Sequence, residues 1–351
     1  MECLLMVSLA QWSMLMITVL AYDSQRQPLF SAIFVFGDSL VDNGNNNKLH
    51  SIAKANYMPY GIDFQGVNPS PTGRFSNGKT IVDFLGEMVG IPLLPPFADI
   101  IEQNIDISRG VNFASASSGI LNETGRNLGE RISFSHQVRN FERTLSQMKT
   151  LMKDENLSHI TIIYVTDLHS LGLRKFFLAA IGPLGCIPYQ ISQGMNPPGQ
   201  CRSNINDMVV LFNTLLRSLV DELNTKYTNS IFVYGDTYEV FNELIKDPDS
   251  YGFTVSDAAC CGFGRNKAQI NCLPMTNICP NRDQYIFWDP FHPTQAVSKI
   301  IANKVLNGPP SVCHPINVIQ MAQKHLPPGQ NRGYLKVRTE GCSWMQPVKG
   351  I

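Results

Sequence analysis

The stretch from Ile33 to Asn47, IFVFGDSLVDNGNNN, limits what this chain can fold into more than any other part of it. A short apolar run, Ile33–Phe36, stops at a glycine and is followed by Asp38, Ser39 and a segment rich in asparagine. That pattern indicates a buried strand with a serine at its carboxyl end. Open α/β sheets bind their ligands at this edge, so Ser39 is a candidate nucleophile if a histidine and a carboxylate reach it.

Five short runs have the composition of strands covered on both faces, because each is β-branched or aromatic and none alternates cleanly. They are Ile33–Phe36, Val111–Ala114, Ile160–Val165, Phe176–Ile181 and Ile231–Tyr234. Helical patterns lie between or after them, at Lys79–Val89, Phe134–Met152, Asn206–Tyr227 and Thr294–Leu306. Alternating strands and helices predict an α/β fold, a three-layer α/β/α sandwich with a mainly parallel five-stranded sheet.

One junction in this scheme is too short. Only the segment TDLHSLGLRK, Thr166 to Lys175, separates Ile160–Val165 from Phe176–Ile181. Neighbouring parallel strands need a crossover of about a dozen or more residues, usually a helix. Either one run is not a strand, or the sheet is irregular, or a segment is missing. We therefore expect the sheet to be disrupted after residue 165.

The two ends of the chain differ in composition from its middle. Residues 1–21 are mostly apolar and finish in Val19-Leu20-Ala21, which favours a secretory signal peptide despite Glu2 and the lack of a nearby Lys or Arg. A signal anchor is the rival, but polar residues interrupt the apolar run. We expect a secreted, extracellular protein with no stable membrane span. Residues 30–320 then form one domain, and 321–351 have the composition of a poorly ordered tail.

Eight cysteines follow the predicted signal peptide. They are Cys186, Cys201, Cys260, Cys261, Cys272, Cys279, Cys313 and Cys342. An even number in a secreted chain favours disulfides, whose pairing the spacing does not determine. Zinc is the alternative, and it is disfavoured because the chain has no Cys-x-x-Cys pair.

Charge and sequons add further expectations about partners. The formal net charge is zero, so no general attraction to nucleic acid or to an anionic membrane is expected. Asn122 and Asn156 each begin a sequon and are candidate glycosylation sites in a secreted chain. The oligomeric state cannot be read from the sequence.

A second stretch, WDPFHPT at residues 288–294, can complete a serine site. Asp289 and His292 lie just before a predicted helix, with prolines between and after them. A short rigid loop can hold both side chains on one side. The carboxylate can then orient the imidazole, which can take a proton from Ser39.

These two stretches resemble the first and last signature blocks of plant GDSL-type esterase/lipases, of the SGNH hydrolase superfamily. The phrases TGRFSNGKTIVDFLGE, GVNFASASSGIL, LGLRKFFLAAIGPLGCIP and ACCGFGRNKAQINCLP resemble further parts of that family. Together they cover most of the chain from Ile33 to about Gln320, so that 30–320 would be the hydrolase domain.

The resemblance implies a flavodoxin-like sandwich and serine hydrolysis without a metal or another cofactor. It assigns Ser39 as nucleophile, with Asp289 and His292 as its acid and base partners. The oxyanion hole would use the N–H of Ser39, a glycine N–H for which Gly119 is the best candidate, and an Asn from a Gly-x-Asn-Asp block.

That third block is where the chain departs from the family. No Gly-x-Asn-Asp follows Ile160–Val165, and the block and much of its crossover helix are absent. Asp167 and His169 are not substitutes, since they fit a truncated surface segment. The loss of one oxyanion donor typically costs ~10²–10³ in rate.

The leading hypothesis is a secreted hydrolase of carboxylic esters, acting on a small-molecule or polymeric ester through Ser39, His292 and Asp289. One alternative is a catalytically impaired splice variant or pseudoenzyme that acts as a binding protein, because the third block is absent. The other is an acyltransferase that uses the same residues.

Overall fold

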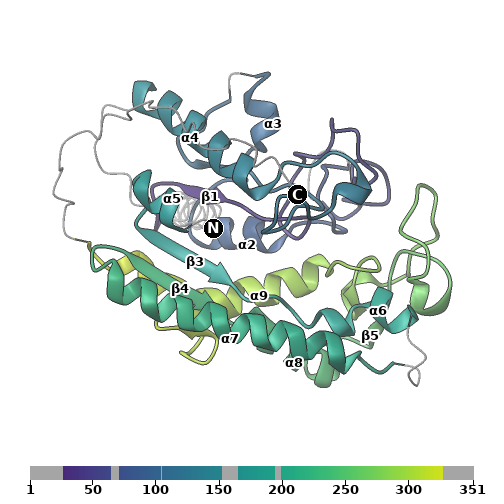
Figure 1. Cartoon of the computed structure of the whole chain (residues 1–351). Coiled ribbons are helices and arrows are strands. Elements are labelled where there is room, and N and C mark those ends of the chain that lie inside the picture. Colours follow the sequence, from purple (N-terminus) through teal and green to yellow (C-terminus); the bar gives the residue numbers. More distant parts are fainter. Residues whose placement is uncertain (1–26, 65–70, 104, 152–164, 194–198, 327–351) are drawn as a thin grey trace, which may run out of the picture.

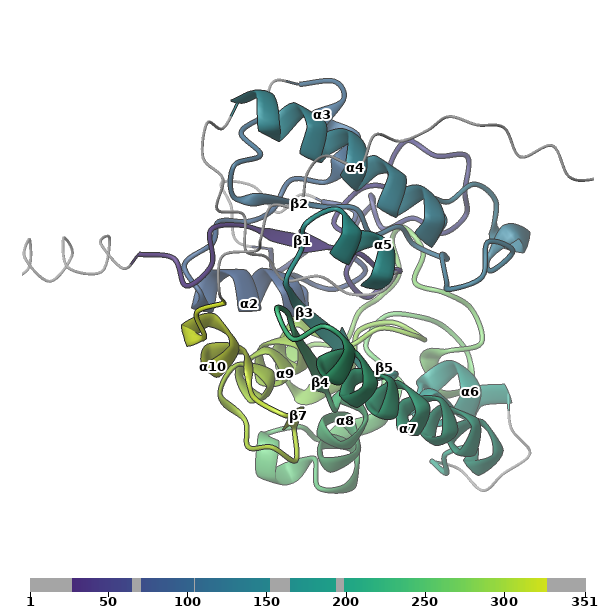
Figure 2. The same cartoon turned by 60° about the vertical axis from the view of Figure 1, so that its left-hand side comes forward.

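Strands run through the centre of the molecule, and helices cover them on both sides (Figures 1 and 2). The computed structural model describes residues 27–64, 71–103, 105–151, 165–193 and 199–326. The strands are β1 (Ile33–Val35), β2 (Gly110–Asn112), β3 (Lys175–Ala179), β4 (Ile231–Gly235), β5 (Val255–Ala259), β6 (Tyr285–Phe287) and β7 (Cys313–His314). The helices are α2 (Ile81–Met88), α3 (Phe97–Ile100), α4 (Phe134–Leu151), α5 (Val165–Ser170), α6 (Pro188–Gln193), α7 (Ser203–Lys226), α8 (Thr237–Lys246), α9 (Gln295–Asn307) and α10 (Val318–Gln323).

The described strands form three separate sheets. β1 pairs with β2 in parallel, β3 pairs with β4 in parallel, and β7 joins β4 antiparallel. β5 and β6 make a third, parallel pair. The predicted α/β class is confirmed, whereas a continuous five-stranded sheet is not found in this part of the chain. Of the predicted strand Ile160–Val165, residues 160–164 lie outside the described residues. The prediction is wrong for Val165, which begins helix α5.

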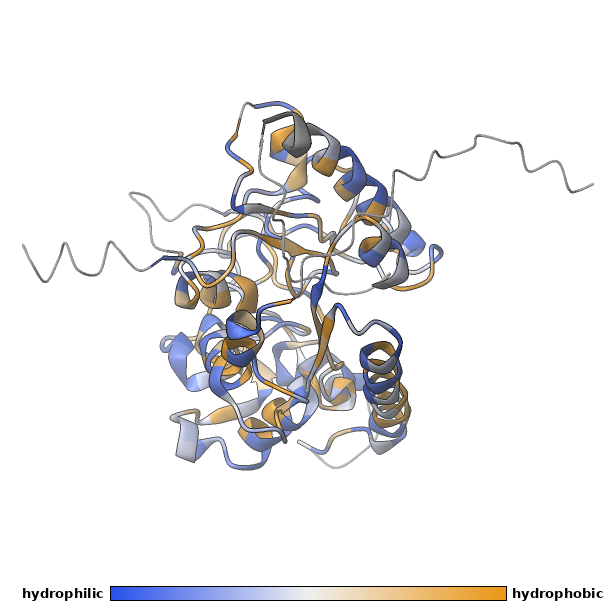
Figure 3. Ribbon diagram, turned by 90° about the vertical axis from the view of Figure 1, so that its left-hand side faces the viewer, coloured by the Kyte–Doolittle hydropathy of each residue, from blue (hydrophilic) through white to orange (hydrophobic). Residues whose placement is uncertain are grey.

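Two apolar clusters lie on opposite faces of the strands. Ile33 and Val35 of β1 belong to a cluster with residues of α2 and α9. Phe34 and Phe36 belong to the other, with residues of α4 and α7. Because successive side chains of a strand point to opposite faces, this alternation puts the strands between two layers of helices. Figure 3 shows the same pattern, with hydrophobic residues on the central strands and on the inner sides of the helices.

Within the described residues, the sheet is interrupted between β1 and β3. In both views β3 lies between β1 and β4, yet no described strand pairing joins β1 to β3. On the edge of β3 away from β4, Ile181, just past the strand, is bonded to the side chain of Asn213. The backbone groups of Lys175 and Phe177 on that edge have no partner among the described residues, although both residues are buried. Buried peptide groups are normally paired. This edge of β3 could therefore accept a further strand.

The four predicted helices are all present, with ends within three residues of those expected. Two of them, α2 and α9, begin with capping side chains. Asp83 accepts from the N–H and the hydroxyl of Thr80 where α2 begins, and the Thr294 hydroxyl accepts from the N–H of Val297 at the start of α9. Such bonds satisfy backbone donors that have no partner within the helix.

Helix α7 has an apolar stripe on its outer surface. Met208, Leu211, Leu215 and Leu219 are 64%, 62%, 62% and 42% exposed. Their spacing places them on one side of the helix, next to the face that packs on β4. Apolar side chains at helical spacing usually face a neighbouring element. The stripe therefore has the composition of a packing surface. In the described part of the chain, no element covers it.

Six of the predicted cysteines form three disulfides, Cys186–Cys201, Cys260–Cys279 and Cys261–Cys272. Because these six cysteines are in disulfides, their sulfur atoms are not available as zinc ligands. Cys313 is buried and unpaired, and burial raises its pKa to about 12. Cys342 lies outside the described residues.

The predicted C-terminal boundary of the domain, after residue 320, falls inside a helix. Helix α10 continues past residue 320, and Met321 is fully buried, so ordered packing extends beyond the expected boundary of the tail. The predicted signal peptide and residues 327–351 lie outside the described residues. Among the helices that the structure describes, none is both long and apolar enough to cross a bilayer.

Candidate active site

Ser39 lies on the loop after β1, and Asp289 and His292 lie on the loop between β6 and α9. His292 Nε2 is 2.8 Å from Ser39 Oγ. His292 Nδ1 is 2.9 Å from Oδ1 of Asp289 and 2.8 Å from Oδ2. The structure thus brings the three predicted catalytic residues into one hydrogen-bonded chain, the arrangement of a nucleophile, a base and an orienting acid.

Asp289 is held as a carboxylate in a buried position. It is 1% exposed, and its Oδ1 accepts from the backbone N–H groups of Phe291 and His292, each at 2.8 Å. Its Oδ2 accepts from the Tyr60 hydroxyl at 2.7 Å. Burial raises the pKa of Asp289, but the charge of His292 and these hydrogen bonds outweigh burial, so the pKa lies below its ordinary value. A charged Asp289 can fix the imidazole and stabilise its protonated form.

Gln137, from α4, fixes the turn that carries Ser39. Its Oε1 accepts from the N–H of Gly37 at 3.0 Å, and its Nε2 donates to the carbonyl of Gly37 at 2.9 Å. The Ser118 hydroxyl donates to the same carbonyl at 2.8 Å. Gln137 is fully buried, and both partners come from segments far from Gly37 in the sequence. The loop before Ser39 is therefore set by helix α4 and by the loop after β2.

The asparagine-rich segment after Ser39 joins the loop of β1 to that of β2. Asn45 Nδ2 donates to the carbonyls of Asn112 and Ala114, and Asn46 Nδ2 donates to that of Ala116. Asp42 accepts from the N–H of Ala116 at 2.8 Å. These side chains are buried and replace the backbone pairing that the loops cannot form.

Two acidic groups near Ser39 have raised pKa values. Burial raises the pKa of Asp42 to about 6, although the hydrogen bonds that its carboxylate accepts from backbone N–H groups oppose the rise. Burial also raises the pKa of Asp38, while a hydrogen bond from the N–H of Leu40 and the charge of His292 oppose the rise. The loop of Ser39 therefore carries acidic groups whose charge depends on local burial.

Gly119, the predicted oxyanion glycine, lies on the loop after β2. A Cβ at this position would come within 2.6 Å of the Thr124 Cγ2 atom, so there is no room for a side chain unless Thr124 moves. Within the described part of the chain, the N–H groups of Ser39 and Gly119 donate to no protein acceptor. Both groups therefore remain available as donors.

The remaining predicted positions lie away from this centre. Asp167 is exposed on α5, and the ring of His169 packs on Tyr227 with centroids 4.2 Å apart. Asn122 is exposed, and its side chain accepts from the Ser135 hydroxyl. Asn156 lies outside the described residues. No group of three or more metal-binding side chains occurs where the structure describes the chain.

Sequence reasoning missed two residues at the site, Tyr60 and Gln137. Tyr60 lies 229 residues before Asp289, in the segment YMPYG, and Gln137 lies 100 residues after Gly37. A buried glutamine in the first turns of the predicted helix Phe134–Met152 is the available signal for Gln137, because a polar side chain on an inner face needs partners. No such pattern points from Tyr60 to Asp289.

Comparison with known proteins adds the family. The family model described as GDSL-like Lipase/Acylhydrolase matches residues 33–167 and 153–305. In Arabidopsis thaliana, the protein named GDSL esterase/lipase At5g08460 is 45% identical, over 86% of this chain and 90% of its own length. GDSL esterase/lipase At1g71250 is 43% identical, over 84% and 89%, and GDSL esterase/lipase 7 is 40% identical, over 85% and 93%.

The same comparisons show an internal gap. The alignment with the first relative spans 348 positions but takes in only 86% of this chain, so more than forty positions of the relative have no counterpart here. The two matched segments of the family model overlap at residues 153–167, which places a break in the match at the short junction. With a family match across most of its length and these relatives, the chain belongs to the GDSL-like lipase/acylhydrolase family.

Proposed function

We propose that this protein hydrolyses carboxylic esters by nucleophilic catalysis at Ser39. The observation that carries the proposal is the 2.8 Å contact between Ser39 Oγ and His292 Nε2, with Asp289 behind the imidazole. Membership of a family whose relatives are named esterase/lipases supports the ester as substrate.

The reaction follows from these contacts. Ser39 Oγ attacks the acyl carbonyl while His292 Nε2 takes the hydroxyl proton, and Asp289 stabilises the imidazolium. His292 then returns the proton to the leaving alcohol, and an acyl-enzyme remains. Water attacks the acyl group with His292 again as base, which releases the acid and restores Ser39.

The oxyanion hole is proposed to consist of the Ser39 and Gly119 N–H groups. Their lack of a protein acceptor among the described residues supports this assignment. The Asn of the Gly-x-Asn-Asp block has no counterpart between Thr166 and Gly172. We therefore expect turnover roughly 10²–10³ below that of a relative with all three donors.

We further propose a secreted, extracellular enzyme with a signal peptide over residues 1–21 and a glycan on Asn122. Three disulfides fit an oxidising compartment, and the exposed Asn122 side chain is accessible to a glycosyltransferase. The substrate class is a small-molecule or polymeric ester. Its acyl and alcohol parts are left open by this proposal.

Purified protein incubated with a p-nitrophenyl ester of a short acid tests the proposal. Wild type should release p-nitrophenol, and Ser39→Ala should lose essentially all of that rate. Ser218→Ala, at an exposed serine of α7, should retain it. Equal rates for wild type and Ser39→Ala would remove Ser39 from the mechanism.

The absent third block favours a second candidate, a catalytically impaired protein that binds an ester without turnover. This candidate predicts that ester binds wild type and Ser39→Ala alike and that neither releases product. Acyl transfer uses the same residues and is separated by adding an alcohol acceptor and identifying the acyl product.

A further inference from the structure

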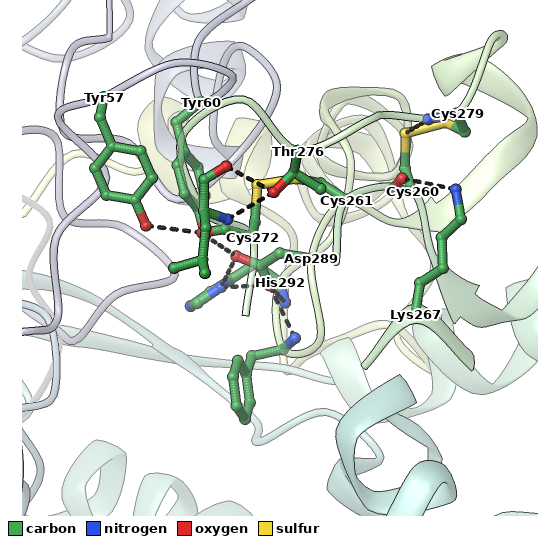
Figure 4. Close-up of a disulfide and its surroundings, with 12 residues drawn as sticks. Tyr57, Tyr60, Cys260, Cys261, Lys267, Cys272, Thr276, Cys279, Asp289 and His292 are labelled. Atoms are coloured by element: carbon green, nitrogen blue, oxygen red, sulfur yellow. Dashed lines mark hydrogen bonds and ion pairs between the residues drawn. A yellow bond between two sulfur atoms is a disulfide. The ribbon is translucent and has the colours of Figure 1, made fainter. Parts of the chain in front are cut away.

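The hydroxyl of Tyr60 makes a direct contact with the proposed catalytic acid. It donates to Asp289 Oδ2 at 2.7 Å, and the same oxygen lies 2.8 Å from His292 Nδ1 (Figure 4). Tyr60 is 4% exposed, so the bond is shielded from water. Two donors from opposite ends of the chain therefore share one carboxylate oxygen.

The ring of Tyr60 is itself fixed by aromatic neighbours. It packs edge-on against Phe75 and Trp288, with centroids 6.0 Å and 6.2 Å away. The Phe75 ring also lies 5.0 Å from the imidazole of His292. Edge-to-face contacts of this kind favour a defined ring orientation. The phenol oxygen is thus held where it reaches Asp289 without a change of rotamer.

We propose that Tyr60 is a positioning residue that acts through Asp289 to hold His292 in line with Ser39. This inference rests on the proposed function. Asp289 Oδ1 is already fixed by two backbone N–H groups, and Tyr60 fixes Oδ2, so both oxygens face defined donors. A neutral donor does this without cancelling the negative charge that the imidazolium needs.

The charged and titratable groups around His292 determine how the loss of the Tyr60–Asp289 hydrogen bond should change the pH dependence of the reaction. Asp289 faces its Nδ1 side, and Asp38 interacts with it from the loop after β1. Tyr60 and Tyr57 lie beyond the carboxylate, and their pKa values are raised by burial and by the charge of Asp289, so both stay neutral donors. Without the Tyr60 hydroxyl, Asp289 Oδ2 becomes a stronger acceptor for the imidazole Nδ1–H.

Tyr60→Phe tests the proposal, with Tyr57→Phe as its matched control. The Tyr57 hydroxyl donates to the carbonyl of Cys272 and not to Asp289. We expect Tyr60→Phe to lower kcat roughly 10-fold with KM within about twofold, and to move the acid limb of kcat/KM to higher pH. Tyr57→Phe should leave the acid limb in place. An unchanged kcat and acid limb in folded Tyr60→Phe would overturn the proposal.

A double-mutant cycle tests whether Tyr60 acts through Asp289. The rate of labelling by a fluorophosphonate should fall in Tyr60→Phe, and the same change should have no effect in an Asp289→Asn background. An equal effect in both backgrounds would show that Tyr60 acts by another route.

Proton NMR of the wild type gives a readout that needs no turnover and no variant. The Tyr60 hydroxyl proton should be protected from exchange and should show a cross-relaxation contact with the His292 Nδ1 proton. If Ser39→Ala proves as active as wild type, the proposed function fails, and this spectrum still shows whether the Tyr60 hydroxyl is bonded to Asp289 beside His292. A hydroxyl proton that exchanges freely would refute it.

Discussion

At the scale of single residues, the most consequential contact outside the site is the buried ion pair of Arg74 and Asp83. The guanidinium bonds both carboxylate oxygens, at 2.7 Å and 2.8 Å, and both residues are about 5% exposed. Arg74 precedes Phe75, whose ring packs on His292, and Asp83 lies in the first turn of α2. The pair therefore ties α2 to the segment that borders the imidazole.

Removal of Arg74 should destabilise the protein in a pH-dependent way. Burial raises the pKa of Asp83, but the charge and hydrogen bonds of Arg74 outweigh it, so the folded pKa is below its ordinary value. The pair's stabilisation is therefore complete above the unfolded pKa and is lost as pH falls through the folded one. Arg74→Met should cost about 3–5 kcal/mol at pH 7, because it leaves Asp83 charged, buried and unpaired.

Urea denaturation at several pH values checks this prediction. The difference between wild type and Arg74→Met should shrink from pH 7 towards pH 3, where a protonated Asp83 no longer needs its partner. Arg126→Met is the control, because Arg126 and Glu123 are exposed and 3.9 Å apart, a pair worth about 0–1 kcal/mol. A difference that stays constant or grows at low pH contradicts the account.

At the scale of elements, helix α7 has one face that packs on the core and another that contacts no element in the described part of the chain. Leu216 is 7% exposed and Leu215 is 62% exposed, although they are neighbours in the chain. Leu216→Ala should cost about 2–5 kcal/mol because it leaves a cavity in the core. Leu215→Ala should change stability by no more than about 0.5 kcal/mol.

The free energies of unfolding of the two variants, from urea denaturation, decide this point. An equal cost for Leu215→Ala and Leu216→Ala would mean that the stripe of α7 is covered, in solution, by an element of the chain or by another copy. Unequal costs would leave the stripe as an open apolar surface.

Elements differed in how well the sequence predicted them. The strands β1, β2, β3 and β4 and the helices α2, α4, α7 and α9 could be predicted, because apolar runs and helical spacing are local signals. The strand β5, VSDAA, was missed because it has no apolar run, and β7 because it is two residues long. Strand β7 forms only through its pairing with Tyr234 and Gly235 of β4.

At the site, motifs pointed to Ser39, Asp289 and His292, and the structure brings these side chains together. The supporting contacts were not predictable. Tyr60 and Asp289, and likewise Gln137 and Gly37, meet only through the tertiary fold. The disulfide pairing was also beyond the sequence, because six cysteines allow many connectivities.

At the scale of the whole molecule, the break between β1 and β3 and the gap against the relatives describe one feature. The family match breaks at residues 153–167, and more than forty positions of the first relative have no counterpart. Among the residues that the structure describes, Lys175 and Phe177 leave an unpaired edge on β3. A strand and its crossover helix would pair that edge and cover apolar surface on the helical side. Within the described residues, the sheet is therefore divided close to the place where the relatives have additional positions.

Replacement of residues 153–167 by the corresponding longer stretch of GDSL esterase/lipase At5g08460 should restore both stability and rate. We expect a higher midpoint of thermal unfolding, because buried peptide groups gain partners and apolar area is covered. We also expect hydrolysis to rise about 10²–10³-fold if the stretch supplies an oxyanion donor. A control insert of equal length that is rich in Gly and Ser should raise neither the unfolding midpoint nor the rate of hydrolysis. No gain in either property would show that the divided sheet is complete as it is.

The central claim is that Ser39 is the nucleophile of an ester hydrolase, and the most direct measurement is the mapping of a covalent adduct. Folded protein is treated with a fluorophosphonate, digested and examined by mass spectrometry, with Ser39→Ala and Ser218→Ala beside it. The account predicts one adduct, on the peptide that contains Ser39, present in wild type and Ser218→Ala and absent in Ser39→Ala. No adduct on folded wild type, or an adduct that persists in Ser39→Ala, would contradict it.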